Sequence, residues 1–327
     1  MENKIKRLAV FTSGGDAPGM NAAIRAVVRT ATFHDLHIYG IKRGYEGMID
    51  GDIIRLERGN VGNIMHRGGT MLKTARCKKF MTKAGRKQAY ESLIAHDIDG
   101  LIAIGGNGTF TGAKAFSKEY NIPVVGIPGT IDNDLFGTDY TIGFDTAVNT
   151  AIEAVDRIRD TADSHNRLFF VEVMGRHSGF IALKTGIGSG ASGILIPETI
   201  ITIEDLIQKL KKGAKRNKLF SLVIVAEGNQ NGGAQDFAKK IQEQFDHYDT
   251  KVAIIGHLQR GGSPSGFDRV LASRLGFGAV EGILAGQKGV MCGLVNAKIE
   301  FTSFDEAINK RKAPDEDLIR MAEILAL

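Results

Sequence analysis

Three stretches with the pattern of buried β-strands each run directly into a loop rich in glycine or carboxylate. Leu8-Ala-Val-Phe precedes Thr12-Ser-Gly-Gly-Asp-Ala-Pro-Gly, Gly100-Leu-Ile-Ala-Ile precedes Gly105-Gly-Asn-Gly-Thr, and Ile122-Pro-Val-Val-Gly-Ile precedes Pro128-Gly-Thr-Ile-Asp-Asn-Asp. In parallel α/β sheets, ligands bind beyond the carboxyl ends of the strands. The pattern therefore predicts that two glycine loops and one acidic loop meet at a single sheet edge.

The two glycine loops have the composition of anion-binding sites. Glycine allows the backbone to approach a phosphate closely, and the helix that follows offers free N–H groups and the positive end of its dipole. Neither loop continues into Gly-Lys-Ser/Thr, as a Walker A loop does, and neither fits the Gly-x-Gly-x-x-Gly of a dinucleotide-binding unit. We therefore expect a phosphate-bearing ligand, and a generic P-loop or NAD site is disfavoured.

The rest of the chain alternates helical and strand patterns, which predicts parallel sheets with crossover helices. A helix is expected after Pro18, with Arg25 and Arg29 one turn apart on a polar face, and an amphipathic pattern from Val148 to Ile158 predicts another. Further strands are expected at 168–173, 193–196, 222–226 and 252–255, and further helices at 204–212 and 235–245.

Composition sets broad limits. A chain of 327 residues favours two lobes, and 43% hydrophobic with 24% charged residues is typical of a soluble globular protein. The net charge of +5 comes from dispersed basic residues without an aromatic-basic motif, so no nucleic-acid partner is expected. No apolar run could span a membrane, no signal-peptide pattern is present, and only two cysteines, Cys77 and Cys292, occur. A cytoplasmic location is expected.

Four longer motifs carry a resemblance to a known family. They are Ser13-Gly-Gly-Asp-Ala-Pro-Gly-Met-Asn, Gly129-Thr-Ile-Asp-Asn-Asp, Val171-Glu-Val-Met-Gly-Arg and Gly256-His-Leu-Gln-Arg-Gly-Gly-Ser-Pro. Together, and in this order, they resemble the bacterial ATP-dependent 6-phosphofructokinases, and the resemblance covers essentially the whole chain. A single glycine pair would be weak evidence, whereas four motifs in order are specific.

The resemblance implies a fold and an activity. The fold would be α/β, with two Rossmann-like three-layer α/β/α lobes and mostly parallel sheets. The larger, ATP-binding lobe would hold 1–142 plus 256–309, and the smaller, fructose-6-phosphate-binding lobe would hold 143–255 plus 310–327. The implied activity is transfer of the γ-phosphoryl group of ATP to fructose 6-phosphate, with Mg²⁺, by a homotetramer.

Phosphoryl transfer requires positioning, charge neutralisation and a base for the acceptor hydroxyl. By resemblance, Asp132 is that base, Thr130 bonds the moving phosphoryl group, and Asp134 helps to hold Mg²⁺. Arg76 matches the arginine that bridges the transferring phosphate, for which a guanidinium fork is well suited. Outside the motif, an Asp-x-Asp after a strand would indicate a turn, and Arg76 would indicate a surface residue.

The same correspondence assigns the binding residues. Arg176 is expected to act in both catalysis and sugar binding, and Arg167 and Lys251 would reach the site of a neighbouring subunit. Alternatives remain for some of these residues: Tyr45 could be a packed surface aromatic, Met174 plain core, and Arg25 and Arg29 part of a solvated helix face. The nucleotide residues would be Gly15, Tyr45, Arg76, Cys77, Gly106, Asn107, Gly108 and Thr109. The sugar-phosphate residues would be Thr130, Ile131, Asp132, Arg167, Met174, Gly175, Arg176, Glu227, Lys251, His257 and Arg260. The residues around an ADP or phosphoenolpyruvate effector would be Arg25, Arg29, Arg58, Arg159, Arg216 and Lys218.

The chain departs from the family pattern at positions that bear on function. Asn107 stands where an aspartate contacts the magnesium of Mg-ATP, so the metal is expected to be held more weakly, with Asn107 and Asp134 as its protein ligands. Lys251 replaces an arginine, which exchanges a bidentate fork for a point charge and should lower affinity for the sugar phosphate. At the effector site Ser192 replaces a common glutamate and Phe220 a frequent histidine, so regulation is expected to be weak or altered.

Several activities compete. Gly108 and Gly129 favour ATP, because pyrophosphate-using relatives commonly carry an acidic residue and a lysine there. A pyrophosphate-dependent enzyme or a kinase of another sugar phosphate is the nearest alternative. The Gly105–Thr109 loop is also similar to that of NAD and lipid kinases, which do not account for the other motifs. Asn107 also suggests an alternative of another class, a catalytically silent paralogue with a regulatory role. Measuring turnover distinguishes this alternative from an enzyme.

Overall fold

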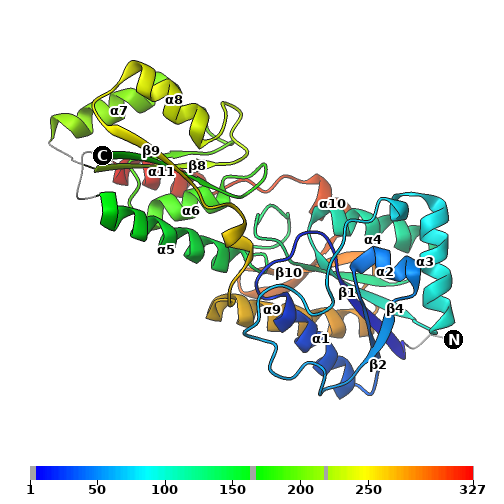
Figure 1. Ribbon diagram of the computed structural model, residues 1–327. Coiled ribbons are helices and arrows are strands. Elements are labelled where there is room, and N and C mark those ends of the chain that lie inside the picture. The colour runs from blue at the N-terminus through cyan, green and yellow to red at the C-terminus, as the bar shows by residue number, and fades with distance from the viewer. Residues whose placement is uncertain (1–4, 163–166, 217–219, 327) are drawn as a thin grey trace. The chain divides into compact units, whose positions relative to one another are not determined.

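The computed structural model describes residues 5–162, 167–216 and 220–326, and the chain divides into two compact units (Figure 1). Unit 1 comprises Met1–Thr130, Leu135–Asp145 and Arg260–Arg311. Unit 2 comprises Ile131–Asp134, Thr146–Gln259 and Lys312–Leu327. The lobe boundaries expected from the sequence lie a few residues from these, but that expectation did not separate the short acidic segment Ile131–Asp134 from the strand before it.

Unit 1 is built on a seven-stranded sheet with the order β11-β10-β5-β4-β1-β2-β3. Its inner pairs are parallel, and β3 and β11 pair antiparallel at the two edges. Leu8 lies opposite Ile38 on one side and Gly100 on the other, so the first two glycine loops follow adjacent strands. The strands are β1 (Arg7–Thr12), β2 (His37–Ile41), β3 (Ile53–Leu56), β4 (Gly100–Gly105), β5 (Val124–Pro128), β10 (Val290–Val295) and β11 (Lys298–Ser303).

Helices cover both faces of this sheet, as Figure 1 shows. α1 (Met20–Phe33) and α9 (Gly266–Leu284) pack together on one face. The other face is covered by a core that includes the aromatic side chains of Phe11, Phe110 and Phe116. Side chains alternate between the two faces along each strand, so the central strands are buried on both sides. The helices of the second layer are α2 (Gly44–Asp50), η1 (Lys79–Met81), α3 (Lys83–Ala95), α4 (Asn107–Tyr120) and α10 (Phe304–Asn309).

Unit 2 has a four-stranded, wholly parallel sheet with the order β7-β8-β6-β9. α7 (Ile203–Lys215) and α8 (Ala234–Gln244) pack on one face, and α7 begins with a capping box between Thr202 and Asp205. The other helices are α5 (Phe144–Ala162), α6 (Phe180–Gly188), η2 (Gly256–Arg260) and α11 (Glu316–Leu325). The strands are β6 (Arg167–Val173), β7 (Gly193–Leu195), β8 (Phe220–Ala226) and β9 (Asp249–Ile254). The α/β class, the mostly parallel sheets and the expected strands are confirmed.

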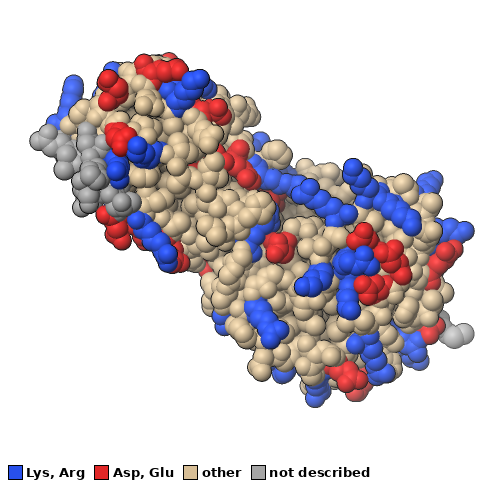
Figure 2. Space-filling view, in the orientation of Figure 1, with Lys and Arg blue, Asp and Glu red and all other residues tan. Residues whose placement is uncertain are grey.

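No helix among the described residues is both long and apolar enough to cross a membrane. On the face that Figure 2 shows, Lys and Arg side chains are interspersed with Asp and Glu on each unit.

Candidate functional site

In unit 1 the two glycine loops contact each other beyond the ends of β1 and β4. The backbone N–H of Ser13 donates to the carbonyl of Ile104 at 3.0 Å, and the Thr109 hydroxyl donates to the carbonyl of Ser13 at 3.0 Å. A Cβ at Gly105 would lie 2.3 Å from the Thr109 hydroxyl oxygen and 2.6 Å from the Ser13 carbonyl oxygen. Only glycine therefore lets these loops close on each other.

The second glycine loop is also the start of α4. Gly106 is the N-cap, and Asn107, Gly108 and Thr109 form the first turn. The N–H groups of a first helical turn have no acceptor within the helix, and they carry the positive end of the dipole. A Cβ at Gly108 would meet no atom within 4 Å, so the backbone there faces open space. This helix N-terminus has the geometry of a phosphate site.

Thr130 lies beside that helix start. A Cβ at Gly106 would lie 3.5 Å from the Thr130 Cβ. The N–H of Gly129 donates to the carbonyl of Gly105 at 3.0 Å, and the Thr141 hydroxyl donates to the Thr130 carbonyl at 2.6 Å. Unit 1 thus brings Thr130, Gly106 and Thr109 together, as the sequence predicts for ends of adjacent parallel strands.

The side chain of Arg260 packs against the first glycine loop. A Cβ at Gly15 would be 2.6 Å from Nη1 of Arg260, and that nitrogen donates to the Asp16 carbonyl at 3.1 Å. Arg260, which the sequence assigns to the sugar phosphate, is therefore a neighbour of the proposed nucleotide loop within unit 1. Arg76 is exposed on the loop between β3 and η1.

Tyr45 and Cys77 belong to the core of unit 1. Tyr45 is 6% exposed, its ring stacks on Phe80 with centroids 3.9 Å apart, and its hydroxyl donates to the Thr109 carbonyl at 2.5 Å. Burial raises the pKa of Tyr45 well above its ordinary value. Cys77 packs, partly buried, against the same core. The ring is packed, but in the core rather than at the surface that the alternative assumed, and Tyr45 is not part of the proposed nucleotide site.

In unit 2 a serine hydroxyl ties the acidic segment to the Met174-Gly-Arg turn. Ser178 Oγ lies 2.8 Å from the Asp132 carbonyl oxygen and 2.9 Å from the Gly175 carbonyl oxygen, and these two acceptors share its single proton. Asp132 is 5% exposed, and the Ile131 side chain is fully buried, so Ile131 has only backbone to offer a ligand. Ser178 therefore sets where the proposed base lies relative to the proposed sugar-binding turn.

The turn itself is held by a carboxylate and an amide. Glu227 Oε1 accepts from the N–H groups of Gly175 at 3.2 Å and Arg176 at 2.8 Å. Oε1 of the fully buried Gln259 accepts from the Met174 N–H at 2.8 Å. Gln259 lies in η2, which also carries the exposed His257. Proposed sugar-binding residues from three separate segments thus meet in unit 2.

Lys251 lies on β9, the edge strand of the unit 2 sheet, and Arg167 begins the neighbouring strand β6. Arg167 of β6 is opposite Asp249 of the edge strand β9. Lys251 Nζ is 2.8 Å from Asp249 Oδ1, and Arg167 Nε is 3.5 Å from Oδ2. The hydrogen bond from Lys251, with the nearby Arg167, lowers the pKa of Asp249. One carboxylate therefore holds both cations on the exposed rim of the unit.

Two of the proposed effector residues lie on α1 of unit 1. Arg25 is half-buried, and burial together with the charge of Arg29 lowers the pKa of Arg25. Two like charges one helical turn apart favour an anion between them. Arg58 is exposed on the loop that follows β3.

The other effector candidates belong to unit 2, except Lys218, which lies outside the described residues. The Arg159 guanidinium donates to the Ser189 carbonyl. Arg216 and Ser192 line a cavity of about 150 Å³, together with Lys209, Lys212 and Ser221. Phe220 begins β8.

The donors proposed for Mg²⁺ are Asn107 in unit 1 and Asp134 in unit 2. Carboxylate and amide oxygens are the hard ligands that Mg²⁺ prefers, and this ion is usually held by one or two carboxylates plus substrate phosphates. Within the described ranges no group of three or more His, Cys, Asp or Glu side chains could hold a metal alone. The donor set therefore fits a metal that arrives with a phosphate ligand.

Sequence reasoning missed three residues that build the site: Ser178, Asp249 and Gln259. Gln259 lies inside a quoted motif without an assigned role, and Ser178 comes two residues after the Met174-Gly-Arg turn. Their polar side chains between glycines were the available signal. Asp249 had no such signal, because only the pairing of β6 with β9 brings it beside Arg167.

These features define a two-unit α/β protein in which a helix start with the geometry of a phosphate site follows the strand ends of unit 1. The phosphofructokinase family model matches residues 7–283. The ATP-dependent 6-phosphofructokinase of Cytophaga hutchinsonii is 53% identical over 321 residues, 98% of each chain. The ATP-dependent 6-phosphofructokinase 1 of Thermus thermophilus is 54% identical over 323 residues, 99% of this chain and 100% of that protein. The chain belongs to the phosphofructokinase family.

Solved structures agree. Phosphofructokinase from Saccharomyces cerevisiae matches 93% of this chain with a TM-score of 0.89 and 37% identity, and the match spans 45% of the yeast chain. The chain thus spans less than half the length of that relative. A pyrophosphate-dependent phosphofructokinase from Marinobacter aquaeolei matches with a TM-score of 0.84 at 25% identity, over 98% of this chain and 92% of that one.

Proposed function

We propose that this chain transfers the γ-phosphoryl group of ATP to the 1-hydroxyl of D-fructose 6-phosphate, giving fructose 1,6-bisphosphate in the committed step of glycolysis. Full-length relatives at 53% and 54% identity carry the name of this activity, and both donor and acceptor follow from it. The pyrophosphate-dependent neighbour is more distant, at 25% identity.

One structural observation carries the choice of donor: the open backbone at Gly108. Because a Cβ there would meet nothing within 4 Å, the first turn of α4 has room for the α-phosphate of a nucleotide. An acidic side chain at this position would fill that space and repel the phosphate. Gly129 has no such room, since a Cβ there would lie 3.0 Å from Ile104 and 3.1 Å from Met20. A lysine at 129 would require repacking.

In the proposed reaction, the site residues have separate roles. The N–H groups of the α4 first turn and the Gly15 loop bind the phosphates, and Arg76 neutralises charge on the transferring group. Asp132 accepts the proton of the 1-hydroxyl while the Gly175–Arg176 turn and Glu227 orient the sugar. Asn107 and Asp134 are the residues that would hold Mg²⁺, which would supply further charge neutralisation to the phosphates.

A coupled assay of the purified protein tests this function. Fructose 6-phosphate is supplied with ATP or with pyrophosphate, each with and without Mg²⁺. Turnover with ATP and Mg²⁺, and none with pyrophosphate, is the expected result. Turnover with pyrophosphate alone would contradict the donor, and calorimetric ATP binding without any turnover would indicate the silent regulatory paralogue.

Assembly and regulation extend the proposal. Arg167 and Lys251, on the exposed rim of unit 2, would complete the 6-phosphate site of a neighbouring subunit in a cytoplasmic homotetramer, so an isolated subunit should be nearly inactive. Light scattering during serial dilution, with activity followed in parallel, tests this.

ADP and phosphoenolpyruvate should act weakly as effectors, because Ser192 offers no carboxylate for an effector's metal. Titrating each compound against the fructose 6-phosphate saturation curve tests this.

A further inference from the structure

The loop that carries Arg76 has no regular structure of its own. Between β3 and η1, residues 57–78 form no helix or strand. Such a segment lacks a ladder of backbone hydrogen bonds, so it is held by turn bonds such as that from the Lys73 N–H to the Thr70 carbonyl, by buried side chains such as Leu72, and by hydrogen bonds to other elements. The hydrogen bonds to other elements connect the loop that carries Arg76 to the rest of unit 1.

Asn21 anchors the middle of this loop. The side chain is 2% exposed and lies in the first turn of α1. Its Nδ2 donates to the carbonyls of Arg67 at 3.1 Å and Gly68 at 3.2 Å, and its Oδ1 accepts from the Met71 N–H at 2.7 Å. One amide thus serves three backbone groups.

Two further anchors hold residues 70–73. The hydroxyl of the fully buried Thr12 donates to the Lys73 carbonyl at 2.9 Å, so the Thr70 hydroxyl, also 2.9 Å away, must donate to Thr12. The Arg43 N–H donates to the Leu72 carbonyl at 2.8 Å.

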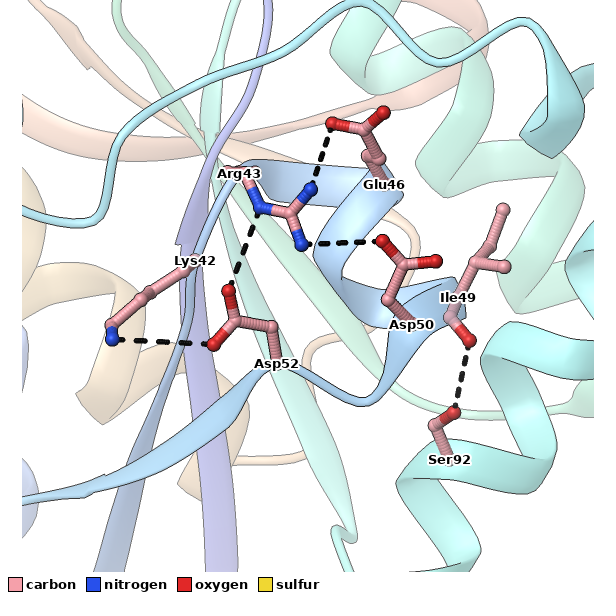
Figure 3. Close-up of polar contacts among 7 residues, drawn as sticks. All are labelled: Lys42, Arg43, Glu46, Ile49, Asp50, Asp52 and Ser92. Atoms are coloured by element: carbon pink, nitrogen blue, oxygen red, sulfur yellow. Dashed lines mark hydrogen bonds and ion pairs between the residues drawn. The ribbon is translucent and has the colours of Figure 1, made fainter.

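Arg43 is itself fixed by charge. Its φ is +56°, and Figure 3 shows its guanidinium facing three carboxylates, Glu46 at 3.3 Å, Asp50 at 3.2 Å and Asp52 at 3.5 Å. In this left-handed conformation its backbone N–H donates to the Leu72 carbonyl, and the ion pairs fix the side chain on the other side.

Thr74 is the last anchor before Arg76. Its hydroxyl donates to the carbonyl of Gly14 at 2.7 Å. Gly14, with φ of +87°, immediately precedes Gly15 of the proposed phosphate loop. A single hydrogen bond therefore joins the segment that carries the arginine to the loop that would hold the phosphates, two residues from Arg76 on one side and one residue from Gly15 on the other.

We propose that Thr74 is a positioning residue for phosphoryl transfer, whose hydroxyl sets Arg76 against the glycine loop. The inference rests on the proposed function. Thr74 touches no reacting atom in this proposal, so its effect on turnover passes through the two segments that its hydrogen bond joins, and we assign it to Arg76 rather than to the Gly14–Gly15 loop. A misplaced guanidinium would reduce stabilisation of the transferring group more than it would reduce binding of the sugar.

Thr74→Val removes the hydroxyl and keeps the shape, whereas Thr74→Ser keeps the hydrogen bond. We expect Thr74→Val to lower kcat by about tenfold or more, because small misplacements of catalytic groups are costly. The KM for fructose 6-phosphate should stay unchanged, and Thr74→Ser should retain the wild-type kcat. Thr32→Val is the matched control, because the Thr32 hydroxyl donates to the Val28 carbonyl at the same 2.7 Å, within α1.

A double-mutant cycle with Arg76→Ala tests whether Thr74 affects kcat through Arg76. If Thr74 acts through Arg76, Thr74→Val should have no further effect on kcat in the Arg76→Ala background. Additive losses would overturn the inference, as would a wild-type kcat in Thr74→Val. Thermal unfolding of all variants separates stability from rate, and Thr74→Ala replaces Thr74→Val if the valine variant fails to fold. An inactive wild-type protein would refute the proposed function instead.

Discussion

The carboxylate of Glu227 accepts a hydrogen bond from the backbone N–H of Arg176 at 2.8 Å. Arg176 has φ of +58°, a left-handed conformation that costs a residue with a side chain about 1–3 kcal/mol. A Cβ at Gly228 would lie 1.7 Å from the Arg176 carbonyl oxygen, so glycine next to Glu227 is required for this approach. Glu227 therefore holds the Gly175–Arg176 turn in a strained conformation, and Glu227 and this turn are both proposed to bind the sugar.

Changing Glu227 should separate these two roles. Glu227→Gln can keep the acceptor for the Arg176 N–H but loses the charge, so it should raise the KM for fructose 6-phosphate with little loss of stability. Glu227→Ala should also lower the free energy of unfolding by about 1–3 kcal/mol, because two backbone donors lose their partner. Sugar saturation curves and urea unfolding measure both effects. Glu243→Gln, on the exposed face of α8, is the control.

Asp132→Ser should lower kcat by several orders of magnitude and leave substrate affinity nearly intact, because a general base acts in the transition state. Ser178 bonds the backbone carbonyl of Asp132 rather than its side chain, so the substitution should leave the segment in place. Steady-state kinetics with fructose 6-phosphate and ATP provide the check. Near-normal turnover would end the proposed role of Asp132.

Asn107→Asp should strengthen the attachment of Mg²⁺ by adding a charge at the first residue of α4. The concentration of Mg²⁺ that gives half the maximal rate should fall, and a negative charge at a helix N-terminus should also favour the helix. Rate measured against free Mg²⁺ at fixed ATP tests this. An unchanged titration would show that Asn107 does not face the metal.

Lys251→Arg should lower the KM for fructose 6-phosphate, since a guanidinium can bond the phosphate through two parallel N–H groups. The ion pair between Arg167 and Asp249 does not involve Lys251, so it should persist in this variant. Saturation curves of assembled enzyme are compared with those of Lys211→Arg, a change at an exposed lysine of α7. No gain in Lys251→Arg would mean that lysine already suits the pocket.

The ion pair between Arg86 and Glu119 predicts a pH-dependent stability. Nε and Nη2 of Arg86 each lie 2.7 Å from a carboxylate oxygen of Glu119. The hydrogen bond from Arg86 is the main cause that lowers the pKa of Glu119 from its ordinary 4.5. A lowered carboxyl pKa stabilises the fold above pH 4.5, and this contribution is lost as the pH falls through the native pKa.

Glu119→Gln should therefore lower the free energy of unfolding by about 1 kcal/mol at pH 7. The difference from the wild-type protein should persist down to pH 4.5 and shrink below it. Urea unfolding across this range measures the difference. A gap that is constant with pH would show that the charge of Glu119 is not its source.

Much of the fold could be predicted from local patterns. Continuous apolar runs such as Gly100–Gly105 identified buried parallel strands, and Pro18 preceded the helix that begins at Met20. The glycine loops were recognisable because close backbone approach requires glycine wherever it occurs, as at Gly105. Four ordered motifs then sufficed for the family, because each combines several such local requirements.

Which side chains position the site was decided by the tertiary structure. Asn21 holds carbonyls at Arg67 and Gly68, and Thr74 reaches Gly14, through hydrogen bonds between residues far apart in the sequence. Tyr45 is buried in the core because α2 packs its ring on Phe80. The type of a residue determines which bonds it can make, and the glycines and apolar runs predict the path of the backbone. Only the packing of distant segments decides which donor meets which acceptor, because the energy of each such bond depends on a partner that the local sequence does not contain.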